Sequence, residues 1–126
     1  MPTHNVSGLE VQLTAHNDGH YFRVHNDVIK SEAQKVNRLL TFVYYLHRQP
    51  SQFKGGNLLI YPTAEINDIK KGYPQQVSPT HNSLVIFPSH YLHEVTPVIC
   101  SSTAFADSRF TFNGWVWQSL DTSSPP

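Results

Sequence analysis

Two side chains that can ligate a metal ion stand two residues apart in this sequence, at His25 and Asp27, and a third, His93, follows much later. On a β-strand this spacing points both side chains to the same face of the sheet. Two imidazoles and one carboxylate form the facial triad that suits non-haem Fe(II) and leaves positions open for substrate and O₂. The downstream Arg109 is of the residue type that grips a carboxylate through two parallel hydrogen bonds. The pattern therefore indicates a metal-dependent oxygenase.

Each of these residues is a weak signal when it is taken alone. An H-x-D pair is more often an ion pair on a surface strand, a lone histidine is more often structural, and a lone arginine usually lies on a solvated face. His90 stands three residues before His93 and competes for the same ligand role. What favours a site is the placement of all these residues on predicted strands, in this order.

Length and composition predict one domain, over residues 1–119, followed by a disordered tail at 120–126. Nine basic and nine acidic residues balance, with no basic stripe for nucleic acid or an anionic membrane surface. The single cysteine, Cys100, excludes an intrachain disulfide and a cysteine-based zinc site. We find no signal peptide and no apolar run long enough to span a bilayer. These features predict a cytoplasmic protein with no nucleic-acid or membrane partner.

Alternating apolar residues and turn signals predict about eight short strands and no confident helix. The predicted strands cover residues 9–15, 20–27, 38–47, 57–61, 83–87, 91–99 and 108–118, with a weak one near 76–77. Residues 28–37 fit a loop or a short helix. This pattern predicts an all-β fold of the double-stranded β-helix, or jelly-roll, class.

Five segments resemble the motifs of the iron(II)- and 2-oxoglutarate-dependent dioxygenases, and within them the prolyl 4-hydroxylase-like branch. They are H-N-D at 25–27, R-L-L-T-F-V-Y-Y-L at 38–46, F-K-G-G-N-L at 53–58, L-V-I-F-P-S with H-E-V-T-P at 84–97, and R-F-T-F-N-G-W at 109–115. The resemblance extends from about Val11 to Trp117, nearly the whole chain. It implies a hydroxylase that uses Fe(II), 2-oxoglutarate and O₂, and that releases succinate and CO₂. The implied substrate is a prolyl or similar aliphatic C–H, in a small molecule or a peptide.

The resemblance also implies roles for individual residues. His25, Asp27 and His93 would ligate the metal, and the match of His-Glu-Val to the family favours His93 over His90. The implied co-substrate residues are Arg109 and Tyr45 on the distal carboxylate, Thr41 and Leu58 along the pocket, and Trp115 as its wall. His16 stands where the family often has a tyrosine, and we expect it to face the pocket.

Two other interpretations stay open at this point. One is a non-catalytic, metal-binding jelly roll of the cupin type, which would need no carboxylate clamp. The other is a carbohydrate-binding jelly roll that uses the aromatic residues, but it leaves the triad unexplained. Arg109 together with Tyr45 discriminates against the metal-binding jelly roll.

Strand alternation predicts a second, apolar face on the sheet that carries the clamp. If alternate residues of the strands 38–47 and 108–118 face the pocket, their neighbours face outward. The outward set is Leu40, Phe42, Tyr44 and Leu46 on the first strand and Phe110, Phe112 and Val116 on the second. A large exposed apolar patch normally marks an interaction site. We therefore expect a homodimer through this outer face, the alternative being a small helix at 28–37 that shields part of it.

Overall fold

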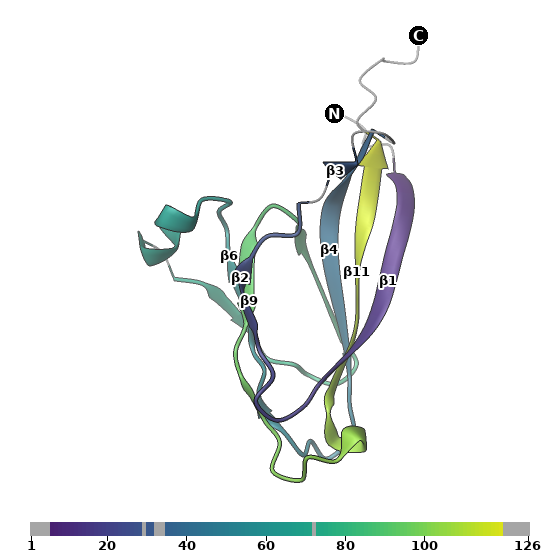
Figure 1. The fold of residues 1–126 in the computed structure, drawn as a ribbon, viewed down its shortest axis with the longest axis vertical. Coiled ribbons are helices and arrows are strands. Elements are labelled where there is room, and N and C mark those ends of the chain that lie inside the picture. The colour runs from purple at the N-terminus through teal and green to yellow at the C-terminus, as the bar shows by residue number, and fades with distance from the viewer. Residues whose placement is uncertain (1–5, 29, 32–34, 72, 120–126) are drawn as a thin grey trace.

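The fold consists of antiparallel strands in two facing layers (Figure 1). The computed structural model describes residues 6–28, 30–31, 35–71 and 73–119. The larger layer has the spatial order β1 (Val6–His16), β11 (Arg109–Ser119), β4 (Val36–Leu46) and β8 (Ser83–Pro88), with β3 (Lys30–Ser31) also paired to β4. The smaller layer has the order β2 (Phe22–His25), β9 (Leu92–Val95), β6 (Leu58–Tyr61) and β7 (Gln75–Val77). A separate pair joins β5 (Lys54–Gly55) to β10 (Val98–Ile99).

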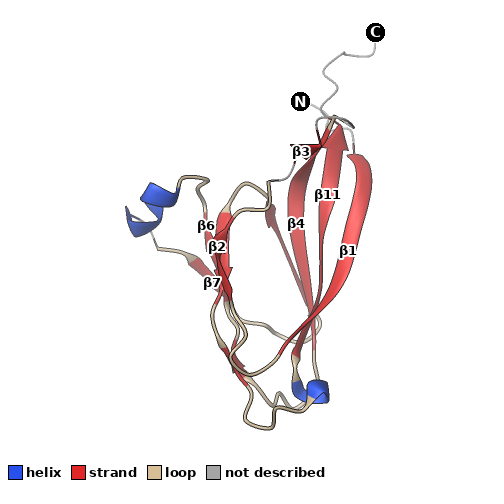
Figure 2. Cartoon of the chain, in the orientation of Figure 1, coloured by secondary structure: helices blue, strands red, loops and turns tan. Residues whose placement is uncertain are grey.

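This architecture confirms the predicted jelly roll, with differences in detail. The described helices are two 3₁₀ segments at the periphery, η1 (Ile66–Lys71) and η2 (Phe105–Asp107) (Figure 2). The prediction of one strand over 91–99 is wrong, because that segment divides into β9 and β10. Pro97 lacks an N–H, so the pairing of this segment with residues 54–61 is interrupted there. The pairing resumes in the same register at Val98, opposite Gly55. The alternative of a short helix at 28–37 is wrong at residues 30–31, which form the strand β3. Positions 29 and 32–34, and the tail 120–126, lie outside the described residues.

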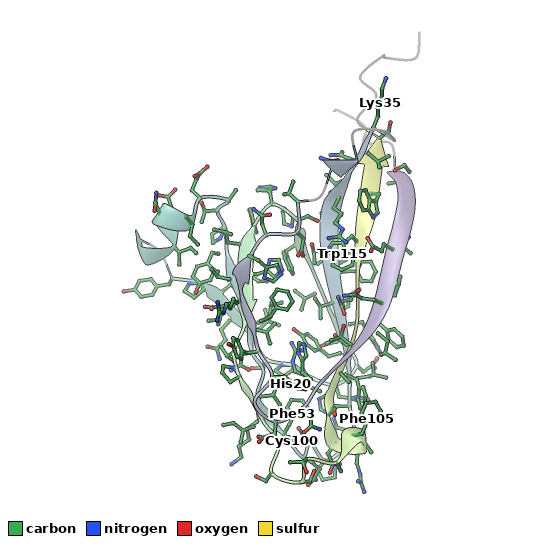
Figure 3. The ribbon with its side chains drawn as sticks, in the orientation of Figure 1. His20, Lys35, Phe53, Cys100, Phe105 and Trp115 are labelled. Atoms are coloured by element: carbon green, nitrogen blue, oxygen red, sulfur yellow. The ribbon has the colours of Figure 1, made fainter. Side chains whose placement is uncertain are left out.

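The apolar core leaves one part of the space between the layers open. Leu58 and Ile60 of β6 pack against Phe87 of β8 and so join the two layers. A smaller cluster of Phe53, Val98 and Cys100 lies at the end of the molecule away from the termini (Figure 3). The remaining inner surface is richer in polar side chains and borders a cavity. It is formed by β1, β11 and β4 of the larger layer and by β2 and β9 of the smaller one.

The alternation predicted for β4 and β11 is present in the register of the pair. Tyr45 faces Thr111 and Thr41 faces Trp115, and all four side chains border the cavity. The intervening pairs point to the opposite face: Leu46 with Phe110, Tyr44 with Phe112, Phe42 with Gly114, and Leu40 with Val116. The strand pattern alone therefore located both faces of this sheet.

The outer face of the larger layer is apolar across all four of its main strands, exposed on β1 and β8 and half-buried over most of β4 and β11. Beside β11, the apolar face continues onto β1 through Leu9, Val11 and Leu13. Beyond β4, it continues onto β8 through Leu84 and Ile86. Leu13 is 61% exposed and Ile86 57% exposed, which is high for aliphatic side chains in the middle of strands. A contiguous surface of this kind is typical of a protein interface.

We predict that two copies of the chain associate through this outer face. Phe112, which is 40% exposed near the centre of the face, should be critical, so Phe112→Asp should convert a dimer into a folded monomer. Light scattering at micromolar concentration measures the mass. Ile66→Asp, an equally polar change at an exposed site on η1, is the matched control. A monomeric wild type, or a Phe112→Asp variant that stays dimeric, would rule out this interface.

Candidate active site

Three potential metal ligands converge at one end of the strand pair β2–β9. His25 and His93 are direct partners across that pair, and Asp27 follows β2 by two residues. His25 Nε2 lies 3.3 Å from Asp27 Oδ1, and His93 Nε2 lies 3.2 Å from Asp27 Oδ2. Each of the three residues offers one ligand atom, and these three atoms all lie within 4.8 Å of one another. Two nitrogens and one oxygen so placed can bind a divalent transition metal on one side and leave the other side open.

The backbone fixes which imidazole nitrogen faces this point. His25 Nδ1 lies 2.7 Å from Arg23 O, and His93 Nδ1 lies 3.0 Å from Tyr91 O. A carbonyl oxygen can only accept, so each Nδ1 carries the proton and donates it. Each Nε2 therefore faces Asp27, where it can bind a metal once it carries no proton. A carbonyl that accepts from Nδ1 is a common support of metal-bound histidine.

Asp27 is held by the larger layer as well as by the histidines. Its N–H donates to Ser89 O at 2.9 Å, and its Oδ2 accepts a hydrogen bond of 2.9 Å from Thr41 Oγ1. Burial by itself raises the pKa of the Asp27 carboxyl, but hydrogen bonds from His25 and His93 outweigh it and bring that pKa far below its usual range. The carboxylate is therefore anionic at neutral pH, as a metal ligand must be.

The same contacts act in the opposite sense on His25. Burial lowers its pKa, but the bonds to Asp27 and to the Arg23 carbonyl more than offset this and leave the pKa raised. A proton at His25 Nε2 lies where a divalent cation would bind. Metal binding at this point should therefore release a proton.

Arg109, at the start of β11, is a buried cation that forms no ion pair with any residue that the structure describes. Its side chain is only 2% exposed, its Nε donates to Gly56 O at 2.8 Å, and its Nη1 lies 3.2 Å from His16 Nδ1. Both partners are neutral, and no carboxylate in the described part of the chain pairs with the guanidinium. Burial lowers the pKa of Arg109, against a smaller opposing effect of Tyr45. A buried charge of this kind calls for an anion from outside the chain.

Tyr45 supplies a second unsatisfied group beside this cation. Its side chain is 0% exposed, and its hydroxyl has no hydrogen-bond partner among the described residues. Burial raises the pKa of Tyr45, although the nearby Arg109 opposes the shift, so the hydroxyl remains a donor at neutral pH. Buried polar groups rarely stay unpaired, and this one borders the cavity. The pair therefore fits the distal carboxylate of a ligand such as 2-oxoglutarate.

All nine residues assigned to the metal or co-substrate site from the sequence border one cavity of about 410 Å³. They are His16, His25, Asp27, Thr41, Tyr45, Leu58, His93, Arg109 and Trp115, the last of which is labelled on β11 in Figure 3. His90 is exposed, packs against Tyr91 and does not border the cavity. Thr41 differs from expectation in one respect, because its hydroxyl is bonded to Asp27 and so supports a metal ligand. The metal and co-substrate roles of these residues remain predictions.

Several residues of the site were not singled out from the sequence. Ser89 is fully buried and lies 3.0 Å from the Thr41 hydroxyl, behind Asp27. Arg38 lies 3.7 Å from the centre of the Trp115 ring and bonds to Glu10 at 3.0 Å. Strand alternation could not predict that Arg38 faces the cavity, because β4 has a bulge at this point. Val116 pairs with Leu40, but the next residue, Trp117, pairs with Arg38 and skips one residue of β4. This shift turns Arg38 to the cavity face although its even number matches the outward residues.

Gly56 positions Arg109, because its carbonyl oxygen accepts the hydrogen bond from Arg109 Nε. It has a φ of 65°, and a methyl group added there would lie 2.6 Å from Arg109 Cδ and 2.9 Å from its Nε. We predict that Gly56→Ala displaces the guanidinium and weakens 2-oxoglutarate binding by about tenfold or more. Metal affinity should not change. Gly19→Ala, which has a φ of 81° and open space around it, controls for backbone strain alone. Equal 2-oxoglutarate affinities for the two variants in calorimetry would contradict this role.

Comparisons of the sequence and of the fold with known proteins both find 2OG-Fe(II) oxygenases and hydroxylases. A sequence model of the 2OG-Fe(II) oxygenase superfamily matches residues 11–117. The chain is 42% identical, over 118 residues, to an uncharacterized PKHD-type hydroxylase from Synechocystis sp.. That match covers 92% of this chain but 38% of the cyanobacterial protein, so the chain spans well under half the length of this relative.

Solved structures with a similar fold come from the same group of proteins. A prolyl-4-hydroxylase from Pseudomonas putida superimposes with a TM-score of 0.61 at 23% identity, over 89% of this chain and 54% of the other. A 2OG-Fe(II) oxygenase family protein from Burkholderia pseudomallei gives 0.60 at 17% identity, over 86% and 41%. The viral collagen prolyl hydroxylase of Paramecium bursaria Chlorella virus-1 gives 0.55 at 16% identity, over 92% and 63%. At these identities the likeness concerns the fold. No helix in the described part of the chain has the length and apolar character needed to cross a membrane.

Proposed function

Because the chain belongs to the 2OG-Fe(II) oxygenase superfamily, we propose that it forms the catalytic domain of a hydroxylase that oxidises a prolyl or similar aliphatic C–H bond. One observation carries the proposal. The buried Arg109 guanidinium, without a carboxylate among the described residues, borders the same cavity as the His25, Asp27 and His93 triad. A metal site and an anion site that share a cavity match the two ends of 2-oxoglutarate.

Each part of the cavity has a distinct task in this proposal. The triad would hold Fe(II), while Arg109 and Tyr45 would hold the distal carboxylate of 2-oxoglutarate. When bound together, iron and 2-oxoglutarate supply the activation of O₂ that hydroxylates a C–H bond, with loss of CO₂ and formation of succinate. The chain keeps Asp27 anionic, orients both imidazoles through backbone carbonyls, and lines part of the cavity with the side chains of Leu58 and Trp115.

Arg109 also separates this proposal from the alternative of a non-catalytic, metal-binding jelly roll. A scaffold that only held a metal would gain nothing from a buried cation on the far wall, and would incur its desolvation cost. The side chain is nevertheless 2% exposed and fixed by Gly56 and His16. Its burial therefore favours a bound carboxylate and a catalytic role.

The opposite rim of the cavity supports an uncharged, hydrogen-bonding substrate such as a peptide segment. Arg38 is neutralised there by Glu10, which also accepts a hydrogen bond of 3.1 Å from Trp117 Nε1. Amide side chains from Gln12 and Asn113, on neighbouring strands, border the same region. Neutral amides and a stacked, paired guanidinium suit peptide carbonyls and rings more than a strongly charged group.

Mass spectrometry tests the proposed reaction class. The protein would be incubated with Fe(II), 2-oxoglutarate, ascorbate and a library of proline-containing peptides, with free proline in a parallel sample. We expect one oxygen atom to be added to a proline of at least one substrate by the wild type, and none by His93→Ala. Succinate formation without modification of any prolyl substrate would remove the prolyl assignment and leave an oxygenase of another substrate class. An absence of both products would contradict the proposal itself.

A further inference from the structure

His16 lies directly opposite Arg109 in the β1–β11 pair, and both side chains border the cavity. Arg109 Nη1 lies 3.2 Å from His16 Nδ1. The other contact of the guanidinium, from Nε to Gly56 O, is to backbone. His16 is therefore a side chain that fixes a terminal nitrogen of the guanidinium at the border of the cavity.

The chemistry of the pair determines the protonation state of His16. A guanidinium can only donate hydrogen bonds, so His16 Nδ1 must accept, and the ring proton must lie on Nε2. The environment agrees, because burial, Arg109 and His20 all lower the pKa of His16, to about 4. The rings of His16 and His20 are 6.2 Å apart, and no carboxylate of the described residues is paired with His16. His16 thus remains neutral at physiological pH.

We infer that His16 is a positioning residue for co-substrate binding: its neutral Nε2–H tautomer accepts a hydrogen bond from Arg109 and orients the guanidinium toward the ligand carboxylate. This inference rests on the proposed function and adds to it a specific role for this chain's histidine. Since Nδ1 is occupied by Arg109, the remaining ring donor is Nε2–H, for which the described residues provide no partner. That uncharged donor is available to the bound anion.

Binding of 2-oxoglutarate tests the role directly, without turnover. Calorimetry would use protein loaded with Mn(II) and kept free of oxygen. His16→Phe retains a ring but has no acceptor, and we expect about tenfold weaker binding. His16→Asn places its oxygen near the position of Nδ1 and should recover most of the affinity. His90→Phe, an exposed histidine outside the cavity, is the matched control and should bind like the wild type. Mn(II) affinity and melting temperature should be equal in all four proteins.

The outcomes separate this inference from the proposed function. If the wild type and His16→Phe bind 2-oxoglutarate equally, the positioning role is wrong and the proposed function survives. If the wild type does not bind 2-oxoglutarate, the proposed function fails first, and the inference with it.

The tautomer gives an independent readout that needs no variant. Nitrogen-15 NMR of the wild-type protein should show His16 with a protonated Nε2 and an unprotonated Nδ1 from about pH 8 down to about pH 5. A proton on Nδ1, or an imidazolium within that range, would overturn the inference even if the variants failed to fold.

Discussion

Replacement of His93 by alanine should abolish tight binding of a divalent metal by this chain. His93 supplies one of three ligand atoms that lie within 4.8 Å of one another, and this group contains no fourth ligand among the described residues. Changes to the outer supports of metal ligands typically lower affinity by about 10- to 100-fold, so loss of the ligand itself should lower it by at least about 100-fold. Calorimetry with Mn(II) or Zn(II), which N/O sites of this kind accept in place of Fe(II), measures this loss.

The neighbouring histidine provides the control. His90 stands three residues away, packs against Tyr91 and lies outside the cavity, so His90→Ala should bind metal like the wild type. His93→Ala should also lose the proton release that accompanies metal binding, because His25 and Asp27 would no longer enclose the ion. The opposite pattern, with His93→Ala retaining metal and His90→Ala losing it, would show that the ligand is assigned to the wrong histidine.

Arg109→Lys should lower the affinity for 2-oxoglutarate by about 10- to 100-fold although the charge is retained. A lysine has a single ammonium group and cannot bond to Gly56 O, His16 Nδ1 and a carboxylate with the planar geometry of a guanidinium. Hydrogen bonds to charged groups contribute about 1.5–3 kcal/mol each, which sets the range. Arg109→Ala should lose still more. Calorimetry on Mn(II)-loaded protein measures the change.

The matched control is Arg48→Lys. Arg48 pairs with Asp107 at 3.2 Å, away from the cavity, and its replacement should leave both ligands bound with wild-type affinity. Metal binding by Arg109→Lys should be unchanged, since the triad does not contact Arg109 in any described hydrogen bond. If Arg109→Ala and Tyr45→Phe both bound 2-oxoglutarate as the wild type does, the carboxylate clamp would be excluded.

Features that depend on local alternation could be predicted from the sequence. Residues two apart on one strand share a face, and this rule alone predicts a common face for Thr41 with Tyr45. The same rule predicts a common face for His25 with Asp27, but β2 ends at His25, and Asp27 reaches the site from the segment that follows the strand. The apolar outer surface follows from the same rule, because the intervening residues must point away. The remote partners His93 and Arg109 required the resemblance to the oxygenases as well, since spacing alone cannot bring distant strands together.

Features that depend on a break in the pattern could not be predicted. The bulge between β4 and β11 turns Arg38 inward against the parity of its strand, and nothing in the local sequence marks it. Pro97 interrupts the ladder within a segment whose sequence is typical of a continuous strand. Gly56 was visible as part of a Gly-Gly turn, but its contact with Arg109 links residues 53 apart in the sequence. Such contacts arise only when the two layers close on each other.

The conversion of 2-oxoglutarate to succinate tests the central claim most directly. Many different substrates could be oxidised by such a site, but consumption of 2-oxoglutarate requires the metal triad and the carboxylate clamp in one cavity. Purified protein with Fe(II), ascorbate, O₂ and 2-oxoglutarate should form succinate slowly even without a second substrate, and neither His93→Ala nor Arg109→Ala should do so. Wild-type protein that binds both Fe(II) and 2-oxoglutarate and forms no succinate, with or without candidate substrates, would contradict the account.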